Sequence, residues 1–571
     1  MSPFLKFAFP ILLFTACATS SLKDRVRPSD STAYDYQFQV DHCGSKPCLK
    51  ISLTFENQNG LIDLQLPNQP AGQKESYRAI QGLKVSGGDL EPTSDPSLYH
   101  LKSKAKTWVR VDYDLVQDFN GPLDEDEHYY RPIITEGFFH AFGESIFIFP
   151  NQQTEVPRPI NLHWKTPTDY PLINSFAAHE NEQNLNVSID RLREGTFLGG
   201  KEIRIEKFDI AGNPVWMAFI GKLAFTDDEF ILVLKRVLMT ERDFWKDQNF
   251  PYFFVSAISV SREGHSMGGQ GRKNGFALFA SETMDRDWLD YILSHELFHT
   301  WNGHTITPSE HEERTYWFSE GFTDYYAHLL MLRAQLIDLP EYLKLFNETL
   351  RKYEFSEVKN APVSRVEKDF WNDRAVEKLP YQQGELIAQK WNSEIKHRSK
   401  SKDSLDDAMR AQLADAKKNS TPLNPNSVEK NFSSFLGNSV GSQIDRYIEH
   451  GETIPLPGRL GACVKLMRPT LFSFEMGYDR RKSRSLKRIT GVLPSGPAYA
   501  AGLRDGDILK TGVVVDGDPN QEAKLEIERD HERHSFHYLP RGEKLRVRQY
   551  EMDQVLFKKN PAKCLNYFLQ N

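Results

Sequence analysis

Short stretches of alternating apolar and polar residues dominate the first third of the chain. Residues 49–55 (LKISLTF) and 108–113 (WVRVDY) are examples, and glycine, proline and asparagine separate such stretches. A period of two places alternate side chains on one face of a strand, and turn residues between the runs are typical of antiparallel sheets. We therefore predict an N-terminal β-sandwich domain over residues 35–186.

The spacing of the apolar residues changes after about residue 187. Residues 227–245 carry apolar side chains at helical spacing, whereas residues 252–260 form a strand-like run. Residues 396–455 have a helical pattern with a polar interruption, and short strands and turns follow Pro457. The pattern predicts a multidomain α+β fold, with a mixed domain and helical extension over residues 187–458 and a separate unit over residues 459–560.

Length, composition and charge limit the number of domains and the classes of partner. The chain has 571 residues, of which 26% are charged and 39% apolar, with a net charge of −7. This length suits about three domains with their own cores. The mixed, mildly acidic balance provides no overall basic field, so we expect no nucleic-acid partner. Mean hydropathy is −0.54, and an apolar run of about 18 residues, the length of a membrane span, is missing.

The N-terminus has the pattern of an export signal. Residues 1–16 (MSPFLKFAFPILLFTA) carry one positive charge at Lys6, then a short apolar stretch and small residues before Cys17. The end of this segment resembles a bacterial lipobox, in which the cysteine is lipidated. We predict a signal peptide with lipobox over residues 1–17, a flexible tether over 18–34, and an exported lipoprotein on a bacterial membrane. Ala18 suggests the outer membrane, on its periplasmic or surface face. An ordinary cleaved signal is the alternative.

Four further cysteines are left: Cys43, Cys48, Cys463 and Cys564. An oxidising compartment permits disulfides. The first two could close a small loop, and the last two could bracket a C-terminal unit. Four cysteines allow three pairings, and the sequence does not choose among them.

The strongest chemical signal is SHELFH at residues 294–299. On a helix, His295 and His299 share a face, so both imidazoles can bind one ion, and Glu296 lies beside them. This arrangement suits Zn²⁺. A metzincin would place Gly at position 302 and His at 305, but the chain has Asn and Thr there. The other common third ligand is a glutamate on a following helix, and Glu320 in WFSEGFTDYY (residues 317–326) provides it.

Roles follow for the remaining groups. Asp324, one turn after Glu320, can accept a hydrogen bond from a ligand imidazole. Three protein ligands leave an open position, which is typical of a catalytic zinc, and we expect one zinc per chain. Bound zinc lowers the pKa of water to about 7, and Glu296 would act as general base. Tyr381 is the candidate donor to the oxyanion, with a packed tyrosine as the alternative.

These residues resemble the PDZ-bearing glycyl aminopeptidase family of gluzincin zinc metallopeptidases. HELFHTWN (residues 295–302), WFSEGFTDYY (317–326) and Tyr-x-x-Gly (381–384) match in order and spacing. With weaker similarity elsewhere, the resemblance covers most of residues 190–555. It implies a thermolysin-like catalytic domain over residues 187–458, a PDZ-like domain over 459–560, a peptide or protein substrate, and Tyr381 as transition-state stabiliser.

One stretch departs from the family. Relatives carry a glutamate on the strand above the site, thought to hold the substrate's α-amino group, whereas residues 268–272 here read GGQGR. Gly268 and Gly269 still permit close approach of a peptide, and Gln270 could accept a hydrogen bond. Losing the carboxylate removes about 1.5–3 kcal/mol, and an inward Arg272 would repel an amine. An aminopeptidase is therefore the leading hypothesis, and an endopeptidase or oligopeptidase remains the alternative.

Residues 491–507 resemble the strand, short helix and glycine turn of bacterial PDZ domains. Upstream, Met476, Gly477 and Tyr478 have the form of a carboxylate-binding loop, beside which a C-terminal peptide adds as a strand. The alternative is a domain that packs on the catalytic unit without binding peptides. A basic cluster over residues 480–488 is interpreted as a solvated loop. A second hypothesis, outside the enzymes, is a non-catalytic, peptide-binding surface lipoprotein.

Overall fold

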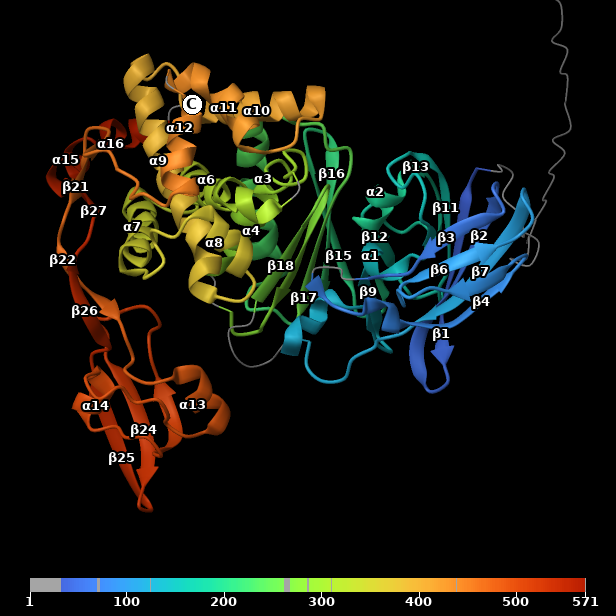
Figure 1. Cartoon of the computed structure of the whole chain (residues 1–571), viewed down its shortest axis with the longest axis horizontal. Helices are drawn as coiled ribbons and strands as arrows, with labels where there is room; N and C mark the ends of the chain where they lie inside the picture. Colours follow the sequence, from blue (N-terminus) through green and yellow to red (C-terminus); the bar gives the residue numbers. More distant parts are fainter. Residues whose placement is uncertain are drawn as a thin grey trace, which may run out of the picture.

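The computed structural model describes residues 32–68, 72–123, 125–260, 267–284, 287–309, 311–437 and 439–569. The predicted signal peptide, the predicted lipidation site Cys17 and most of the predicted tether lie outside these residues. In the described part of the chain, no helix combines the length and the apolar character needed to cross a bilayer. An N-terminal β region, a central sheet covered by helices, and a small C-terminal domain follow one another across the molecule (Figure 1).

The N-terminal region consists mainly of β-strands, as its alternating pattern predicts, and these strands form three sheets. All three contribute to one hydrophobic core, which contains Tyr36, Leu64 and Phe197. In the largest sheet, Tyr36 pairs with Leu53 in antiparallel and with Leu162 in parallel register. The first sheet has the order β13 (Glu182–Val187), β11 (Arg158–Lys165), β1 (Tyr34–Cys43), β2 (Lys46–Asn57), β7 (Thr107–Leu115) and β4 (Ile80–Ser86). The second has the order β10 (Phe149–Pro150), β3 (Leu61–Gln65), β6 (Leu98–Lys102) and β5 (Asp89–Pro92).

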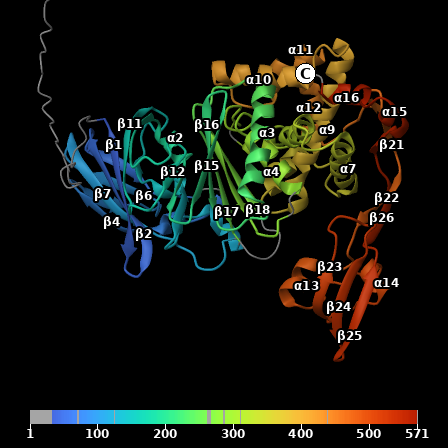
Figure 2. The ribbon, with the colours of Figure 1, turned by 180° about the vertical axis from the view of Figure 1, so that it is seen from behind.

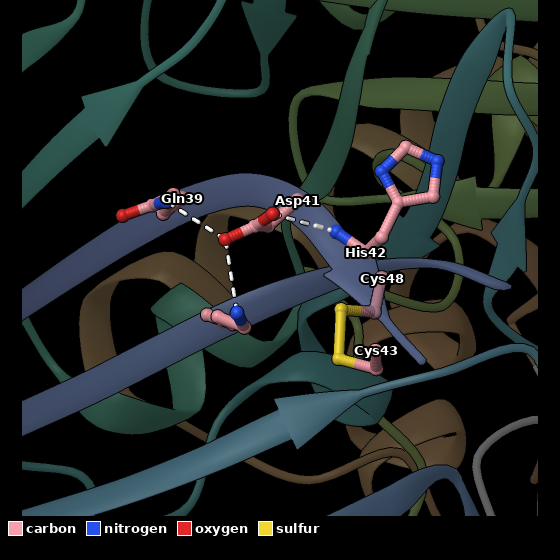
Figure 3. Close-up of a disulfide and its surroundings, with 6 residues drawn as sticks. Gln39, Asp41, His42, Cys43 and Cys48 are labelled. Carbon is pink, nitrogen blue, oxygen red and sulfur yellow. Dashed lines mark hydrogen bonds and ion pairs between the residues drawn. A yellow bond between two sulfur atoms is a disulfide. The ribbon is translucent and has the colours of Figure 1, made fainter. Parts of the chain in front are cut away.

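A disulfide closes the turn between β1 and β2. Cys43 and Cys48 are bonded with their Cα atoms 5.8 Å apart, and Figure 3 shows the bond beside the side chain of Asp41. Asp41 accepts hydrogen bonds from the Lys50 ammonium at 2.9 Å and from the His42 backbone at 2.8 Å. The sequence left the pairing open, and the structure pairs the two nearest cysteines here.

The central sheet is buried on both faces. Alternate residues of its strands, such as Val255 and Leu278, pack against helices, whereas Phe254 and Phe279 pack against the N-terminal region. Its strands follow the order β15 (Arg204–Ile210), β16 (Asn213–Ile220), β17 (Phe253–Ser259), β19 (Gly275–Ala280) and β18 (Met267–Arg272). The third N-terminal sheet, which faces it, has the order β12 (Leu172–Asn174), β14 (Thr196–Gly200), β9 (Phe138–Phe142) and β8 (Ile133–Ile134).

Helices cover the other face of the central sheet. The predicted helix over residues 227–245 is confirmed as α3 (Asp227–Trp245), and a capping box between Thr226 and Glu229 begins it. The helices that carry or support the site are α4 (Asp287–Phe298), α5 (Tyr316–Ser319), α6 (Gly321–Arg333), α7 (Leu339–Phe355), α8 (Val363–Asp369) and α9 (Arg374–Ser399). The predicted polar break in the helical extension separates α10 (Leu405–Asn419) from α11 (Pro425–Leu436) and α12 (Val440–Ile444).

The small C-terminal domain projects from the helical part in both views (Figures 1 and 2). Its separate core lies around Ile489, Leu503 and Leu525. Its elements are β22 (Thr470–Phe474), α13 (Arg480–Leu486), α14 (Pro497–Ala501), β23 (Ile508–Val513), β24 (Ala523–Arg529), β25 (Glu532–Tyr538) and β26 (Arg541–Arg546).

The chain passes from one hydrophobic core to the next at positions that differ from the predicted domain boundaries. Ile189 and Phe197, predicted to follow the first boundary, belong to the core of the N-terminal region. Leu460 and the disulfide-bonded Cys463 and Cys564 belong to the core of the helical part. The flanking elements β20 (Arg459–Leu460), β21 (Val464–Met467), β27 (Gln549–Met552), α15 (Gln554–Lys559) and α16 (Pro561–Leu569) therefore join the small domain to the helices.

Candidate active site

The three predicted metal ligands converge. His295 lies in the last turn of α4 and His299 directly after it, while Glu320 lies between α5 and α6. The Nε2 atoms of the histidines are 3.2 Å apart, and each lies 3.4 Å from Oε2 of Glu320. In the described residues these side chains form a group able to hold a metal ion.

The donor set fits Zn²⁺. Tetrahedral ligands about 2.0–2.1 Å from zinc are separated from each other by about 3.3 Å, which agrees with the distances above. The local charge fits as well. Burial opposes protonation of His295, but hydrogen bonds with Asp324 and Glu320 raise its pKa well above the ordinary value. Although burial alone would raise the pKa of Glu320, the nearby histidines hold it far below its usual range. The site is thus built to attract positive charge.

Buried groups orient both imidazoles. Nδ1 of His295 lies 2.8 Å from Oδ1 of Asp324, as predicted, and Tyr291 donates its hydroxyl to the same oxygen at 2.6 Å. Nδ1 of His299 lies 2.9 Å from the backbone oxygen of Asn302. A hydrogen bond at Nδ1 directs Nε2 of each ring toward the ion. The roles of Tyr291 and Asn302 were not predicted, because the spacing of the motif marks only the ligands.

The predicted base Glu296 lies beside the ligands, under strand β18. Burial raises its pKa, while the two ligand histidines and a hydrogen bond from the backbone of Gly271 act against this rise. A Cβ atom added to Gly269 would lie 3.2 Å from the carboxyl carbon of Glu296 and 2.8 Å from the ring of Phe276. The glycines of β18 therefore let the strand pass close above the base.

Tyr381 lies on α9 at the same site. Its ring is stacked on that of His295, with 6.3 Å between centroids, and its hydroxyl hydrogen-bonds with Glu320. The Tyr-x-x-Gly spacing has a packing reason. A Cβ atom on Gly384 would lie 1.8 Å from the backbone oxygen of Trp317, and one on Gly321 would lie 2.5 Å from Cα of Gly384. The two glycines let α9 cross α5 and α6 at close range, which brings Tyr381 to the ligand.

These groups line a cleft of about 770 Å³. Its wall is β18, the terminal strand in the order of the central sheet, and Gly269, Gln270 and Gly271 line the cleft. Gly268 lies against the ring of Tyr129 instead, and Tyr130 donates its hydroxyl to the backbone oxygen of Gly269 at 3.0 Å. The N-terminal region thus supports the strand from behind.

Arg272 points away from the cleft. Its guanidinium forms an ion pair with Glu144 at 2.8 Å and stacks over the ring of Phe142 at 4.2 Å. Both partners belong to the N-terminal region, in α1 (Gly143–Ile146) and β9. Arg272 therefore does not repel a substrate amine, as an inward side chain would.

Sequence reasoning missed His304, which lines the cleft. Burial lowers its pKa to about 3, so the imidazole is neutral at physiological pH, and it hydrogen-bonds with the backbone of Gly271. It lies one residue before position 305, where a metzincin would carry its third histidine, so the motif does not mark it. Its neighbours come from β18, which is distant in sequence, so no local signal could have revealed its place.

The predicted terminus-binding loop lies far from this cleft, in the small domain. Gly477 has a φ of +75°, and its carbonyl accepts a hydrogen bond from the backbone of Leu493 at 2.9 Å. Directly after Tyr478 the chain enters α13, which Asp479 caps. The backbone that would pair with an added peptide strand is thus helical.

Comparisons with known proteins agree with the site. The family model described as M61 glycyl aminopeptidase matches residues 289–387, the segment that holds all three ligands, the base and Tyr381. No curated protein matches the chain. At the level of class, the family match and the donor set indicate a zinc metallopeptidase of the aminopeptidase type.

Among solved structures, the chain resembles the aminopeptidase N family protein from Idiomarina loihiensis. The identity is 18%, the TM-score is 0.69, and the match covers 94% of this chain and 100% of that one. This shows a shared multidomain fold. An M1 zinc metallopeptidase from Deinococcus radiodurans is more weakly similar, with 15% identity, a TM-score of 0.48 and coverage of 76% and 96%.

Proposed function

We propose that this chain is a zinc-dependent peptidase that acts as an aminopeptidase. One observation carries the proposal: the two histidine Nε2 atoms and Oε2 of Glu320 lie within 3.4 Å of one another beside the buried carboxyl of Glu296. These groups line a cleft whose wall is a glycine-rich strand edge. His295, His299 and Glu320 would hold one zinc ion.

Zinc, when bound, supplies a Lewis acid that polarises a carbonyl and eases loss of a proton from water near neutral pH. Glu296 is placed to take this proton and to deliver it to the leaving amine nitrogen. Its raised pKa suits a group that must both accept and release a proton. Burial raises the pKa of Tyr381 far above its ordinary value, so its hydroxyl keeps the proton with which it stabilises the substrate oxyanion.

Release of single N-terminal residues requires a partner for the substrate's ammonium group. Strand β18 has glycine at position 271, where a carboxylate would supply this partner. Among the described residues that line the cleft, Glu312 and Glu377 are the carboxylates besides Glu296 and Glu320. An endopeptidase or oligopeptidase is the second candidate, because Gly271 leaves the strand open to a longer chain.

A paired assay tests both levels of the proposal. Purified protein is analysed for zinc and incubated with a mixed peptide library, and then with matched free and N-acetylated peptides. We expect one zinc per chain, cleavage, and rejection of the blocked peptides. Cleavage of both the free and the N-acetylated peptides would favour an endopeptidase over an aminopeptidase. A metal-free, inactive protein that bound peptides tightly would overturn the peptidase proposal in favour of a peptide-binding lipoprotein.

We also propose the finer assignment, a glycyl aminopeptidase-like gluzincin with an N-terminal β-sandwich, a thermolysin-like catalytic domain and a PDZ-like C-terminal domain. The N-terminal sheets, which share a common core, support the first part. The short helix α14, followed by Gly502 and Gly506 at positive φ, supports the last. Deleting residues 469–547 and replacing them with a short linker should leave zinc content intact, if this domain is a separate module.

We further propose that the protein is exported and lipid-anchored through Cys17, on the outer membrane. The apolar leader supports this, and so does the pairing of the other four cysteines in disulfides, which suits an oxidising compartment. Labelled palmitate should enter the wild-type protein in cells, whereas Cys17→Ala should remain unlabelled and leave the membrane fraction. Labelling of both would contradict the assignment.

A further inference from the structure

A second cavity lies in the small C-terminal domain, between helix α13 and strand β23. It measures about 460 Å³, within the range of about 300–1,000 Å³ typical of ligand sites. Helix α13 and the residues that flank it contribute Tyr478, Arg480, Arg484 and Lys487 to its lining. The opposite wall is residues 508–512 of β23. The lining is therefore basic on one side and a strand backbone on the other.

Strand β23 is the terminal strand of its sheet, which has the order β23, β24, β25 in the described residues. Among the described residues, its outer side is engaged only near its start, where the backbone of Leu509 donates to that of Lys487 at 3.1 Å and Ile508 forms a bridge with Arg488. Residues 510–513 beyond this point are exposed, Val513 to 67%. An exposed strand edge can accept an extended chain through its backbone groups.

The charges of the cavity are only partly compensated. Arg480 forms an ion pair with Asp516 at 2.7 Å, and Lys510 forms one with Glu528 at 3.0 Å. Within the described chain, Arg484 and Lys487 have no carboxylate within 4.0 Å. Two cations are thus left to face a ligand from the helix side.

We propose that this groove binds an acidic peptide segment in extended conformation, which adds to β23 as a strand. The free edge of β23 supplies backbone hydrogen bonds, and Arg484 and Lys487 supply charge complementarity to Asp or Glu side chains. A concave site beside a strand favours a chain over a lipid surface, which needs cations on an open face. The groove shares the side chain of Tyr478 with the loop at residues 476–478 but extends from it along α13 and β23, and it does not depend on the proposed peptidase activity.

The probe is a fluorescent octapeptide of alternating Glu and Val with both ends blocked, titrated into the full chain with fluorescence anisotropy as the readout. The variant Arg484→Glu with Lys487→Glu reverses the two unpaired cations. We expect a loss of affinity of at least about 10-fold, because like charges then face the peptide. The matched control is Arg481→Glu with Lys482→Glu, which changes the same net charge on the same helix outside the groove lining, and its affinity should stay within about 2-fold of wild type.

Hydrogen exchange tests the mode of binding. Adding the octapeptide should protect backbone amides among residues 510–513 in the wild type, but not in the charge-reversed variant. The same octapeptide with a free C-terminal carboxylate should bind equally well, because the groove takes an internal segment.

Three outcomes would overturn the proposal: equal loss in both double variants, protection confined to other strands, or a requirement for the free carboxylate. A fourth is preferential binding of phosphatidylserine vesicles that is lost in the groove variant. Thermal melting shows whether the variants are folded.

Discussion

The N-terminal β region and the catalytic region both bury ionisable groups, but they use them differently. In the β region, His163 lies between Asp35 and Glu182, with 2.9 Å from its Nε2 to Oδ2 of Asp35, and so connects three neighbouring strands. Arg131 similarly forms a buried pair with Asp118 at 2.5 Å. Each charge is neutralised locally, and none of these residues lines the catalytic cleft.

In the catalytic region the buried charges are crowded around a cleft. Glu296, Glu320 and Asp324 share two histidines, and a further pair, His328 and Glu385, lies 2.9 Å apart behind them. Carboxylates therefore outnumber the cations that compensate them, unless a metal ion is bound. Removing one partner of a buried, locally paired charge destabilises the fold, whereas an excess of one sign beside a cleft is typical of a functional site.

The largest effect should come from the base. Glu296→Gln keeps the size of the side chain but removes proton transfer, so we expect kcat to fall by about 10²–10⁴. Zinc content, measured by metal analysis, should remain one per chain, because residue 296 is not a ligand. Glu320→Gln should instead lose zinc and activity together. Full activity of the Glu296→Gln protein would show that the buried charges here serve stability, as they do in the β region.

Tyr381 sharpens the comparison within the cleft. Tyr381→Phe removes the donor to the oxyanion, and we expect kcat to fall by about 10²–10³ with little change in KM. The control is Tyr316→Phe, since Tyr316 also lines the cleft but donates its hydroxyl to Glu312 at 3.0 Å. Its kcat should change by no more than about 3-fold. Similar losses in both variants would assign Tyr381 a packing role.

Tyr291 tests how far the site extends. Tyr291→Phe removes the 2.6 Å hydrogen bond to Asp324, and we expect zinc affinity, measured by competition with a chelator, to fall about 10-fold. Tyr326→Phe is the matched control, because the hydroxyl of Tyr326 donates to Asp406 at 3.1 Å instead. That variant should lose stability but keep zinc affinity. Unchanged affinity in the Tyr291 variant would limit the orienting groups to Asp324.

The smallest effect concerns the β region. Hydrogen bonding to Asp35 raises the pKa of His163 against the opposing effect of burial. The stabilising contribution of the charged imidazole is therefore fully present below the unfolded-state pKa of about 6.5 and is lost as pH rises through the higher folded-state value. The free energy of opening of β1 and β11, obtained from hydrogen exchange, should therefore fall by on the order of 1 kcal/mol as pH rises across this window.

His163→Gln should flatten that pH dependence. His100→Gln is the control, since His100 forms a more exposed pair with Asp63 at 2.6 Å, and exposed pairs contribute little. A pH profile that survives in the His163 variant would contradict the local role of this pair. Catalytic activity should be unaffected by either change.

The metal site was largely predictable because its signals are local. His295 and His299 share a helix face by spacing alone, and Glu320 with Asp324 lies on the next helical segment. The resemblance strengthened the prediction for Tyr381, whose contact with the site depends on the helix crossing at Gly321 and Gly384. The direction of Arg272 could not be predicted, because its partner Glu144 lies 128 positions away.

The sequence by itself determined the elements and the ligand set. Periodicity reports which face of a strand or helix is buried, and α3 has the predicted bounds for this reason. Only the tertiary structure decided what meets across the chain: His304 under β18, Cys463 with Cys564, and the basic face of α13 beside the open edge of β23. Such contacts depend on how the layers pack. Packing brings together residues that are distant in the sequence, and the local sequence around each residue does not indicate its partner.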